Sequence, residues 1–259
     1  MRISVVVPVR DDARLLERCL AALARQSRPA DEIVVVDNGS SDDSAAVARV
    51  AGARVVVEPM PGIPRAASAG YDAATGELIA RIDADTVCPP DWVARIEEHF
   101  AGDPSLDFLT GDARFADTVP WVDWIGRHFY IGSLYRVMSP LLGHPPLFGS
   151  NLAMRAEAWR QLSAEVHRDR RDIHDDIDLA LHVRPEMTVR RDRELIVDVA
   201  ARPLTDPRSL LRHVWWVVTT LALHGWADAP WRRRARRRAA ASRGSAQKPT
   251  PPALQQPAG

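Results

Sequence analysis

Short apolar runs alternate with segments of helical periodicity over the first 85 residues, and this alternation limits the fold more than any other feature. The runs are rich in β-branched residues and lie at 3–7, 32–36, 54–58 and 78–82. Between the first two, apolar residues recur at helical spacing from Leu15 to Leu23. Apolar strands separated by helices are typical of parallel sheets with right-handed crossovers. The sequence therefore predicts an α/β fold with a Rossmann-like, mostly parallel sheet flanked by helices.

Polar residues interrupt the chain at the ends of three of these predicted strands. They are Arg10-Asp11, the loop 37–40 (Asp-Asn-Gly-Ser) and the segment 83–85 (Asp-Ala-Asp). Ligands of open α/β sheets gather at the carboxyl ends of the strands. Three polar breaks at successive strand ends therefore predict a nucleotide site.

Asp83 and Asp85 are two carboxylates one residue apart at the end of an apolar strand. Like charges this close repel each other unless a cation or hydrogen-bond donors lie between them. Mn²⁺ and Mg²⁺ take oxygen ligands, commonly one or two carboxylates together with substrate phosphates. The pair alone favours a solvated turn that carries two acids, but together with the other two strand ends it favours a metal–diphosphate site.

Charge is distributed unevenly along a chain whose formal net charge is zero. Residues 1–230 carry 26 basic and 34 acidic side chains, whereas 231–259 carry eight bases and no acid. An acidic body suits a metal-using enzyme and argues against nucleic acid as its main ligand. The two cysteines form no disulfide or zinc pattern, and the apolar run 3–7 is too short for an export signal, so we expect a cytoplasmic protein.

The second half is expected to add a helix at 92–100, strands at 107–110 and 152–154, and a helix from Asp175. The segments 188–191 and 195–199 are expected to form a hairpin or paired strands, and 111–120 to be irregular. Aromatic residues at helical spacing between 122 and 137 favour core packing over a ligand platform.

The C-terminal region has a different composition. Residues 206–230 hold Trp215, Trp216 and Trp226, and an arginine cluster follows. The segment is too short to span a bilayer. It suits equally an interfacial helix on an anionic membrane surface and a helix packed on the catalytic domain. Residues 231–259 are expected to form a basic, disordered tail.

Five separated motifs in residues 1–200 resemble those of the family 2 glycosyltransferases, which have the GT-A fold. The family's opening turn, second-strand signature, Asp-x-Asp segment, acceptor-side loop and late acidic motif resemble residues 7–10, 36–42, 76–85, 148–151 with Arg155, and 174–179. Each motif alone is unspecific, and their order makes the resemblance strong. It implies a catalytic domain at 1–205, with a nucleotide-binding half at about 1–110 and an acceptor half at about 111–205.

The resemblance also implies roles for individual residues. Asp176, next to Asp175, is the catalytic base candidate, and Asp85 with Asp83 is the metal site. Donor binding is implied at Pro8, Val9, Arg10, Asp37, Arg65, Asp83 and Ala84, and acceptor binding at Gly149, Ser150, Asn151 and His174. The chain departs from the family pattern at two places. Ala66-Ala67-Ser68 stands where Ala-Arg-Asn is frequent, with Arg65 just upstream, and Asp175-Asp176 stands where Glu-Asp is frequent.

We therefore expect an inverting, Mn²⁺- or Mg²⁺-dependent transfer from a UDP- or GDP-sugar to a carbohydrate or lipid-linked acceptor, with peripheral binding at the inner face of the membrane. Asp176 would take the proton of the acceptor hydroxyl, and any upward pKa shift caused by neighbouring acids would help it to do so. A sugar-phosphate nucleotidyltransferase is the first alternative, although residues 8–12 lack the glycines of its phosphate loop. The second is a non-catalytic scaffold that docks on membranes or nucleic acid through the arginine tail.

Overall fold

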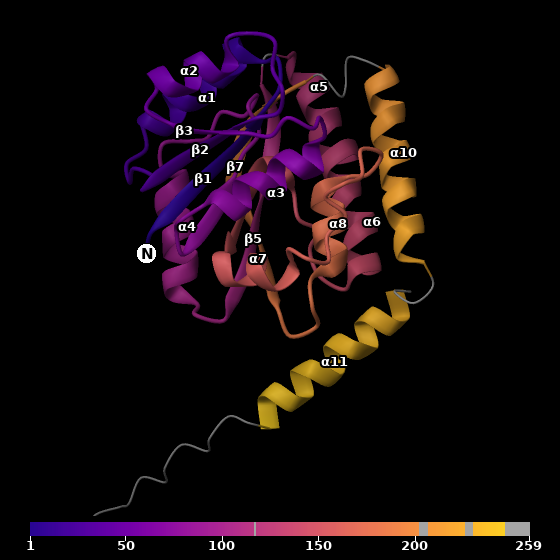
Figure 1. Ribbon diagram of the computed structural model, residues 1–259. Helices are drawn as coiled ribbons and strands as arrows, with labels where there is room; N and C mark the ends of the chain where they lie inside the picture. Colours follow the sequence, from indigo (N-terminus) through magenta and orange to yellow (C-terminus); the bar gives the residue numbers. More distant parts are fainter. Residues whose placement is uncertain (117, 202–206, 226–229, 247–259) are drawn as a thin grey trace, which may run out of the picture.

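A computed structural model describes residues 1–116, 118–201, 207–225 and 230–246, and within them the chain forms a seven-stranded sheet (Figure 1). Its order is β3-β2-β1-β4-β6-β5-β7. β1, β2, β3 and β4 are parallel, β6 is antiparallel to both of its neighbours, and β7 is parallel to β5. The strands are β1 Ile3–Val9, β2 Glu32–Asp37, β3 Arg54–Val57, β4 Leu78–Arg81, β5 Leu106–Ala116, β6 Leu152–Arg155 and β7 Thr188–Ala200. The predicted α/β fold with a mostly parallel sheet is confirmed.

Helices cover both faces of the sheet and extend beyond it. They are α1 Ala13–Ala24, α2 Ser44–Val50, α3 Ile63–Ala73, α4 Trp92–Gly102, α5 Pro120–Ile125, α6 Gly132–Leu142, α7 Ala156–Leu162, α8 Asp175–His182, α10 Pro207–His224 and α11 Pro230–Ala246. A π-helix (η1, Gly126–Ile131) joins α5 to α6, and a 3₁₀ turn (η2, Gly149–Asn151) precedes β6. Val5 and Val7 of β1 belong to one buried apolar cluster and Val6 to the other. Successive strand residues point to opposite faces, so burial on both faces explains why Val5, Val6 and Val7 are all apolar.

Gly70 lets α3 lie close to the sheet. A Cβ at this position would lie 2.3 Å from Val6 Cγ1 and 2.9 Å from Val36 Cγ2. Both valines are fully buried, and closely packed interiors have little room to yield. The helix therefore needs glycine here although glycine weakens helices in general.

We expect Gly70→Ala to lower the free energy of unfolding by about 1–3 kcal/mol, because the added methyl group overpacks the core. Urea unfolding of both proteins measures the change. Gly102→Ala, at the end of α4 where a Cβ would meet no atom within 4 Å, is the matched control and should be neutral. Equal stability of the two variants would contradict this account of α3 packing.

Two expectations for the segment 106–200 are wrong. β5 extends to Ala116, so residues 111–116 are regular, and β7 is one long strand rather than a hairpin. The register of β7 on β5 jumps between Thr110 and Asp112, where Arg191 and Ile196 are the successive partners. The charged residues between them form a bulge, and Asp192 pairs with α4 through Arg95 and His99. A bulge and a turn both interrupt an apolar pattern, which is why the sequence suggested a hairpin.

The aromatic segment 122–137 divides between core and surface. Tyr135 is buried as predicted, whereas Trp124 and Phe129 are exposed, so the core interpretation is wrong for these two.

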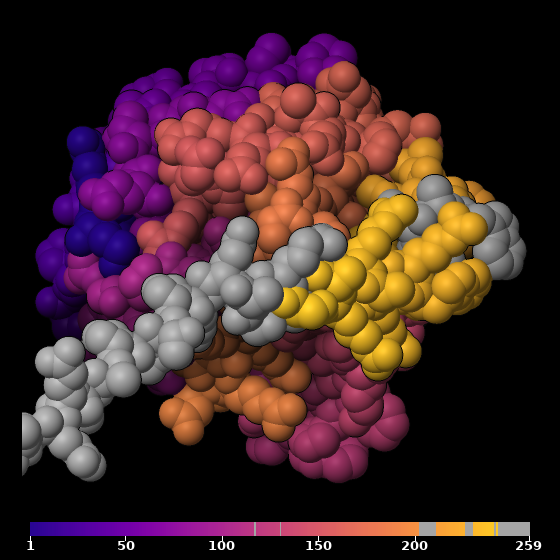
Figure 2. All heavy atoms as spheres, turned by 90° about the horizontal axis from the view of Figure 1, so that it is seen from below, coloured from indigo at the N-terminus to yellow at the C-terminus, as the bar shows by residue number. Residues whose placement is uncertain are grey.

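The arginine-rich segment is helical up to Ala246, which corrects the prediction of disorder for 231–246. Arg233 is buried and donates to the Leu181 carbonyl oxygen, and Arg237 donates to those of Met187 and Arg184. These side chains satisfy main-chain oxygens of α8 and of the segment before β7, and the helix forms a ridge across the face shown in Figure 2. Trp226 and the predicted tail 247–259 lie outside the described residues. Among the described helices, none combines the length and apolar character needed to cross a membrane.

Candidate active site

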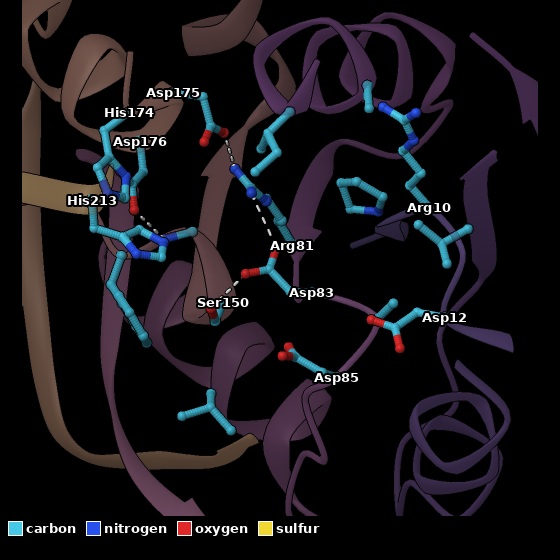
Figure 3. A pocket seen from close by; sticks show the side chains of 18 of the residues that line it. Arg10, Asp12, Arg81, Asp83, Asp85, Ser150, His174, Asp175, Asp176 and His213 are labelled. Atoms are coloured by element: carbon cyan, nitrogen blue, oxygen red, sulfur yellow. Dashed lines mark hydrogen bonds and ion pairs between the residues drawn. The ribbon is translucent and has the colours of Figure 1, made fainter. Parts of the chain in front are cut away.

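A cavity of about 370 Å³ opens at the carboxyl ends of β1 and β4. Its lining also includes residues of η2, the start of α8 and one side of α10. In Figure 3, Asp83 lies between Arg10 and Asp12 on one side and His174 and Asp176 on the other. The lining includes most of the predicted site residues: Pro8, Val9, Arg10, Asp83, Ala84, Asp85, Gly149, Ser150, His174, Asp175 and Asp176.

Three predicted site residues do not line this cavity. Asp37 accepts a hydrogen bond from the Ser40 N–H and so holds the loop after β2, while the adjacent Asn38 reaches the cavity. Arg65 forms an ion pair with Asp169 at 2.8 Å. Asn151 is buried, accepting from Trp92 Nε1 and donating to main-chain oxygens of Asp112 and Leu195, as a packing residue does.

Arg81, the last residue of β4, is at the centre of the site, and the sequence analysis did not single it out. Its side chain is 4% exposed; Nη2 lies 3.0 Å from Asp83 Oδ1, and Nη1 pairs with Asp175 Oδ2. A buried guanidinium requires such counter-charges. The signal available in the sequence was one arginine within an otherwise apolar strand.

Gly149 is required next to this guanidinium. A Cβ at position 149 would lie 2.9 Å from both Arg81 Cζ and Nη1. The Gly149 N–H also donates to Asp176 Oδ2 at 3.0 Å. The turn η2 thus approaches both charged groups closely because it has no side chain there.

The carboxylates of Asp83 and Asp85 have different surroundings. Asp83 Oδ1 is engaged by Arg81, and Oδ2 accepts from Ser150 Oγ at 2.6 Å. Asp85 is half-buried and lines the cavity one residue further along. Carboxylate oxygens are the donors that Mn²⁺ and Mg²⁺ prefer, so the chemistry of this pair suits such an ion.

Asp176 and His174 form a pair at the start of α8, with His174 Nδ1 3.2 Å from Asp176 Oδ1. Burial opposes ionisation of Asp176, but the hydrogen bonds from His174 and the Gly149 N–H outweigh it and lower its pKa to about 2. For Asp175, burial raises the pKa despite the partly compensating Arg81 charge. The upward pKa shift that would help a general base therefore occurs at Asp175 and not at Asp176.

His174 provides a pH test of this pair. Burial disfavours its charged form, but Asp176 outweighs burial and raises the pKa of His174 above 6.5. Stabilisation by a raised pKa is fully present below the unfolded-state value of about 6.5 and is lost as pH rises through the folded-state value. We expect the wild type to exceed His174→Asn in stability most clearly near pH 5.5 and progressively less above neutral pH. Urea unfolding across this pH range measures the difference in stability. A difference that does not change with pH would contradict an ion pair between His174 and Asp176.

α10 completes the cavity with Arg212, His213 and Trp216. The His174 and His213 rings lie 5.4 Å apart, and the backbone N–H of His174 donates to Thr220 Oγ1 at 2.9 Å. The sequence analysis considered this segment for membrane contact or packing and did not predict that it contributes to the site. Periodicity identifies a helix, whereas the side that faces a distant cavity depends on tertiary packing.

Comparison with known proteins gives three kinds of match. The sequence profile described as glycosyl transferase family 2 matches residues 4–162, more than half of the chain. An uncharacterized glycosyltransferase of Mycobacterium tuberculosis is 37% identical over 125 residues, which are 48% of this chain and 54% of that protein. The undecaprenyl-phosphate 4-deoxy-4-formamido-L-arabinose transferase of Sodalis glossinidius is 37% identical over 113 residues, 39% of this chain and 34% of that protein. The chain spans about half the length or less of these curated relatives.

Among solved structures, glucosyl-3-phosphoglycerate synthase from Mycobacterium tuberculosis, in complex with Mn²⁺, UDP and phosphoglyceric acid, is similar with a TM-score of 0.63. The two share 19% identity, and the match covers 86% of this chain and 78% of that one. Staphylococcus aureus TarS (residues 1–349) gives a TM-score of 0.62 at 16% identity, over 78% and 61% of the two chains. These likenesses confirm the GT-A fold.

Proposed function

Because the chain belongs to glycosyl transferase family 2, we propose that it transfers a sugar from a nucleotide-diphospho-sugar to an acceptor hydroxyl, with inversion and with the help of a divalent metal. One observation carries the proposal. Carboxylates from the end of β4 and from α8, about 90 residues apart in the sequence, open onto one cavity. Arg81 links the two segments, because its guanidinium pairs with Asp83 after β4 and with Asp175 of α8.

The donor side of the cavity is formed by Pro8, Val9 and Arg10 after β1, with Asn38 nearby. A nucleotide bound there would direct its diphosphate toward Asp83 and Asp85 in the middle of the cavity (Figure 3). Asp83, already bound by Arg81 and Ser150, would contact the ribose or a metal-bound water. Asp85 would be the main ligand of Mn²⁺ or Mg²⁺, which neutralises charge on a diphosphate leaving group.

The acceptor side is formed by Gly149, Ser150, His174 and Asp176. Asp176 is ionised at neutral pH and can accept the proton of the attacking hydroxyl. Because its low pKa makes it a weak base, proton transfer would rely on its position next to the acceptor. His174 holds one of its oxygens and the Gly149 N–H the other, which orients the carboxylate. An acceptor activated here attacks the sugar on the face opposite the diphosphate, and this geometry inverts the anomeric centre.

A thermal-shift panel of UDP- and GDP-sugars, each with and without Mn²⁺, tests the proposal. A donor that binds the native state raises the melting temperature according to its concentration relative to Kd. We expect at least one nucleotide sugar to stabilise the protein in a Mn²⁺-dependent manner. If no nucleotide or nucleotide sugar shifts the transition, a non-catalytic scaffold is favoured. The nucleotidyltransferase would be favoured if a nucleoside triphosphate with a sugar phosphate stabilised the protein and no nucleotide sugar served as a donor in a transfer assay.

The exposed side of α10 supports a lipid-linked acceptor at an anionic membrane surface. α10 turns His213 and Trp216 toward the cavity and exposes Leu211, Val214, Trp215 and Val218 to solvent. α11 follows with exposed arginines, including Arg232 and Arg238. Apolar side chains beside a basic segment suit an interface rich in anionic lipids. A lipid headgroup held there would lie close to the acceptor side.

We expect Trp215→Ser to weaken binding to phosphatidylglycerol vesicles about tenfold, because it removes a large apolar side chain from the interface. Co-sedimentation measures binding, and phosphatidylcholine vesicles should bind weakly. The control is Val50→Ser on α2, which is also solvent-exposed (91%, against 64% for Trp215) and lies on the opposite side of the molecule from α10 in Figure 1. If both variants bind the vesicles equally well, the membrane proposal is refuted, whereas the proposal of glycosyl transfer is unaffected.

A further inference from the structure

We propose that His167, Asp178, His182 and His224 bind a transition-metal ion such as Zn²⁺, at a site separate from Asp83 and Asp85, and that this ion fixes α10 to α8. The four residues come from three segments: the loop before α8, α8 itself and the end of α10. One ligand atom from each lies within 4.8 Å of the others. The inference does not depend on glycosyl transfer, because it concerns metal binding alone.

Asp178 Oδ1 is the centre of the cluster. It lies 2.7 Å from His167 Nδ1, 3.0 Å from His224 Nε2 and 3.8 Å from His182 Nδ1. Neighbouring ligand atoms in a tetrahedral zinc site are separated by about 3.3–3.6 Å, given metal–ligand distances of about 2.0–2.2 Å. The three separations from Asp178 lie on both sides of this range, and all four ligand atoms lie within 4.8 Å of one another, so the side chains would have to rearrange to admit an ion.

Hydrogen bonds around the cluster already orient its members. Asp178 Oδ2 accepts from the His167 backbone N–H at 2.8 Å, which turns Oδ1 toward the three imidazoles. His182 Nδ1 also lies 2.8 Å from the Asp178 carbonyl oxygen, a contact that binding of an ion through Nδ1 would replace. The rings of His182 and His224 are 4.7 Å apart, and each is 5.4 Å from that of His167.

His167 is the exposed member of the cluster among the described residues. The side chains of Asp178, His224 and His182 are 3%, 7% and 13% exposed, whereas that of His167 is 37% exposed. An ion would enter past His167 and be enclosed by the other three. Three imidazoles with one carboxylate favour Zn²⁺ or Co²⁺, while the oxygen donors of Asp83 and Asp85 favour harder ions. The two sites can therefore be told apart by metal preference.

The location gives the ion a structural role. His224 is the last residue of α10, and the same helix brings Arg212, His213 and Trp216 to the cavity. A metal bond between His224 and α8 would hold this wall of the cavity against the helix that carries Asp176. Binding of Zn²⁺ should accordingly slow amide hydrogen exchange in α10.

The test uses the full chain, stripped with EDTA and titrated with Co²⁺, because tetrahedral Co²⁺ has intense visible bands and octahedral Co²⁺ has weak ones. We expect one equivalent of tetrahedral Co²⁺, displaced by Zn²⁺, and a Zn²⁺-induced rise in melting temperature. His224→Ala and His167→Ala should each weaken binding more than about 100-fold, since loss of a direct ligand exceeds the effect of losing an outer partner. His167 is at the exposed rim, so its variant tests the site even if His224→Ala fails to fold.

Two controls separate this site from others. Asp85→Ala should retain the tetrahedral spectrum, and so should His99→Ala, a partly buried histidine paired with Asp192 outside the cluster. The proposal is overturned if the wild type gives no tetrahedral spectrum, if His167→Ala binds as tightly as the wild type, or if Asp85→Ala abolishes the spectrum.

Discussion

Asp176→Asn is expected to lower kcat about 10²–10⁴-fold, the range that a positioned general base contributes. The amide cannot accept the proton of the acceptor hydroxyl, yet its oxygen can still accept from the Gly149 N–H, so the site should keep its shape. The KM for the donor should change little, because Asp176 lies on the acceptor side. Initial rates with a working donor–acceptor pair measure both constants.

Asp172→Asn is the matched control for this experiment. Asp172 lies four residues before Asp176, is partly exposed, and pairs with Arg170 rather than with a cavity residue. Its variant should keep normal turnover. Near-normal turnover of Asp176→Asn would remove Asp176 from the role of base.

Asp85→Ala is expected to reduce transfer about 10²–10³-fold, comparable to the loss of one group that stabilises transition-state charge. The same substitution should abolish Mn²⁺-dependent stabilisation by the donor, because the main metal ligand is gone. In the wild type, EDTA should abolish transfer and Mn²⁺ should restore it.

Asp91→Ala serves as the control, since Asp91 is an exposed acid that follows Asp85 by six residues and lies outside the cavity lining. It should keep both activity and metal response. A wild type that transfers sugar equally well in EDTA would refute the metal proposal, and the Asp176 result would then stand independently.

The parallel half of the fold could be predicted because its strands obey local rules. In β1, Val5, Val6 and Val7 are buried on alternate faces, and a run without polar residues specifies such a strand. Asp83 and Asp85 could be predicted as site residues because the end of a parallel strand fixes where its following residues lie. Asp176 could be proposed only through the family resemblance, since no local rule brings α8 to the end of β4.

The remaining features depend on long-range packing. In the sequence, Arg81 is a single charged residue in an apolar strand. Its role depends on Asp175, which lies 94 residues further along the chain. Asn151 matches a motif residue, yet Trp92 and the carbonyl oxygens of Asp112 and Leu195 use its amide for packing. His213 and Trp216 belong to a helix whose orientation is set by Thr220 and His224 against α8.

The ion pairs of Arg81 have a consequence for recombining this enzyme with its relatives. A chimera that joins residues 1–110 of this chain to the acceptor half of another protein inherits Arg81 without a guaranteed counterpart to Asp175. Breaking a buried pair on one side costs about 3–5 kcal/mol, a large part of a typical domain's stability. Productive hybrids should therefore be those in which positions 81 and 175 are inherited from the same parent or exchanged as a unit.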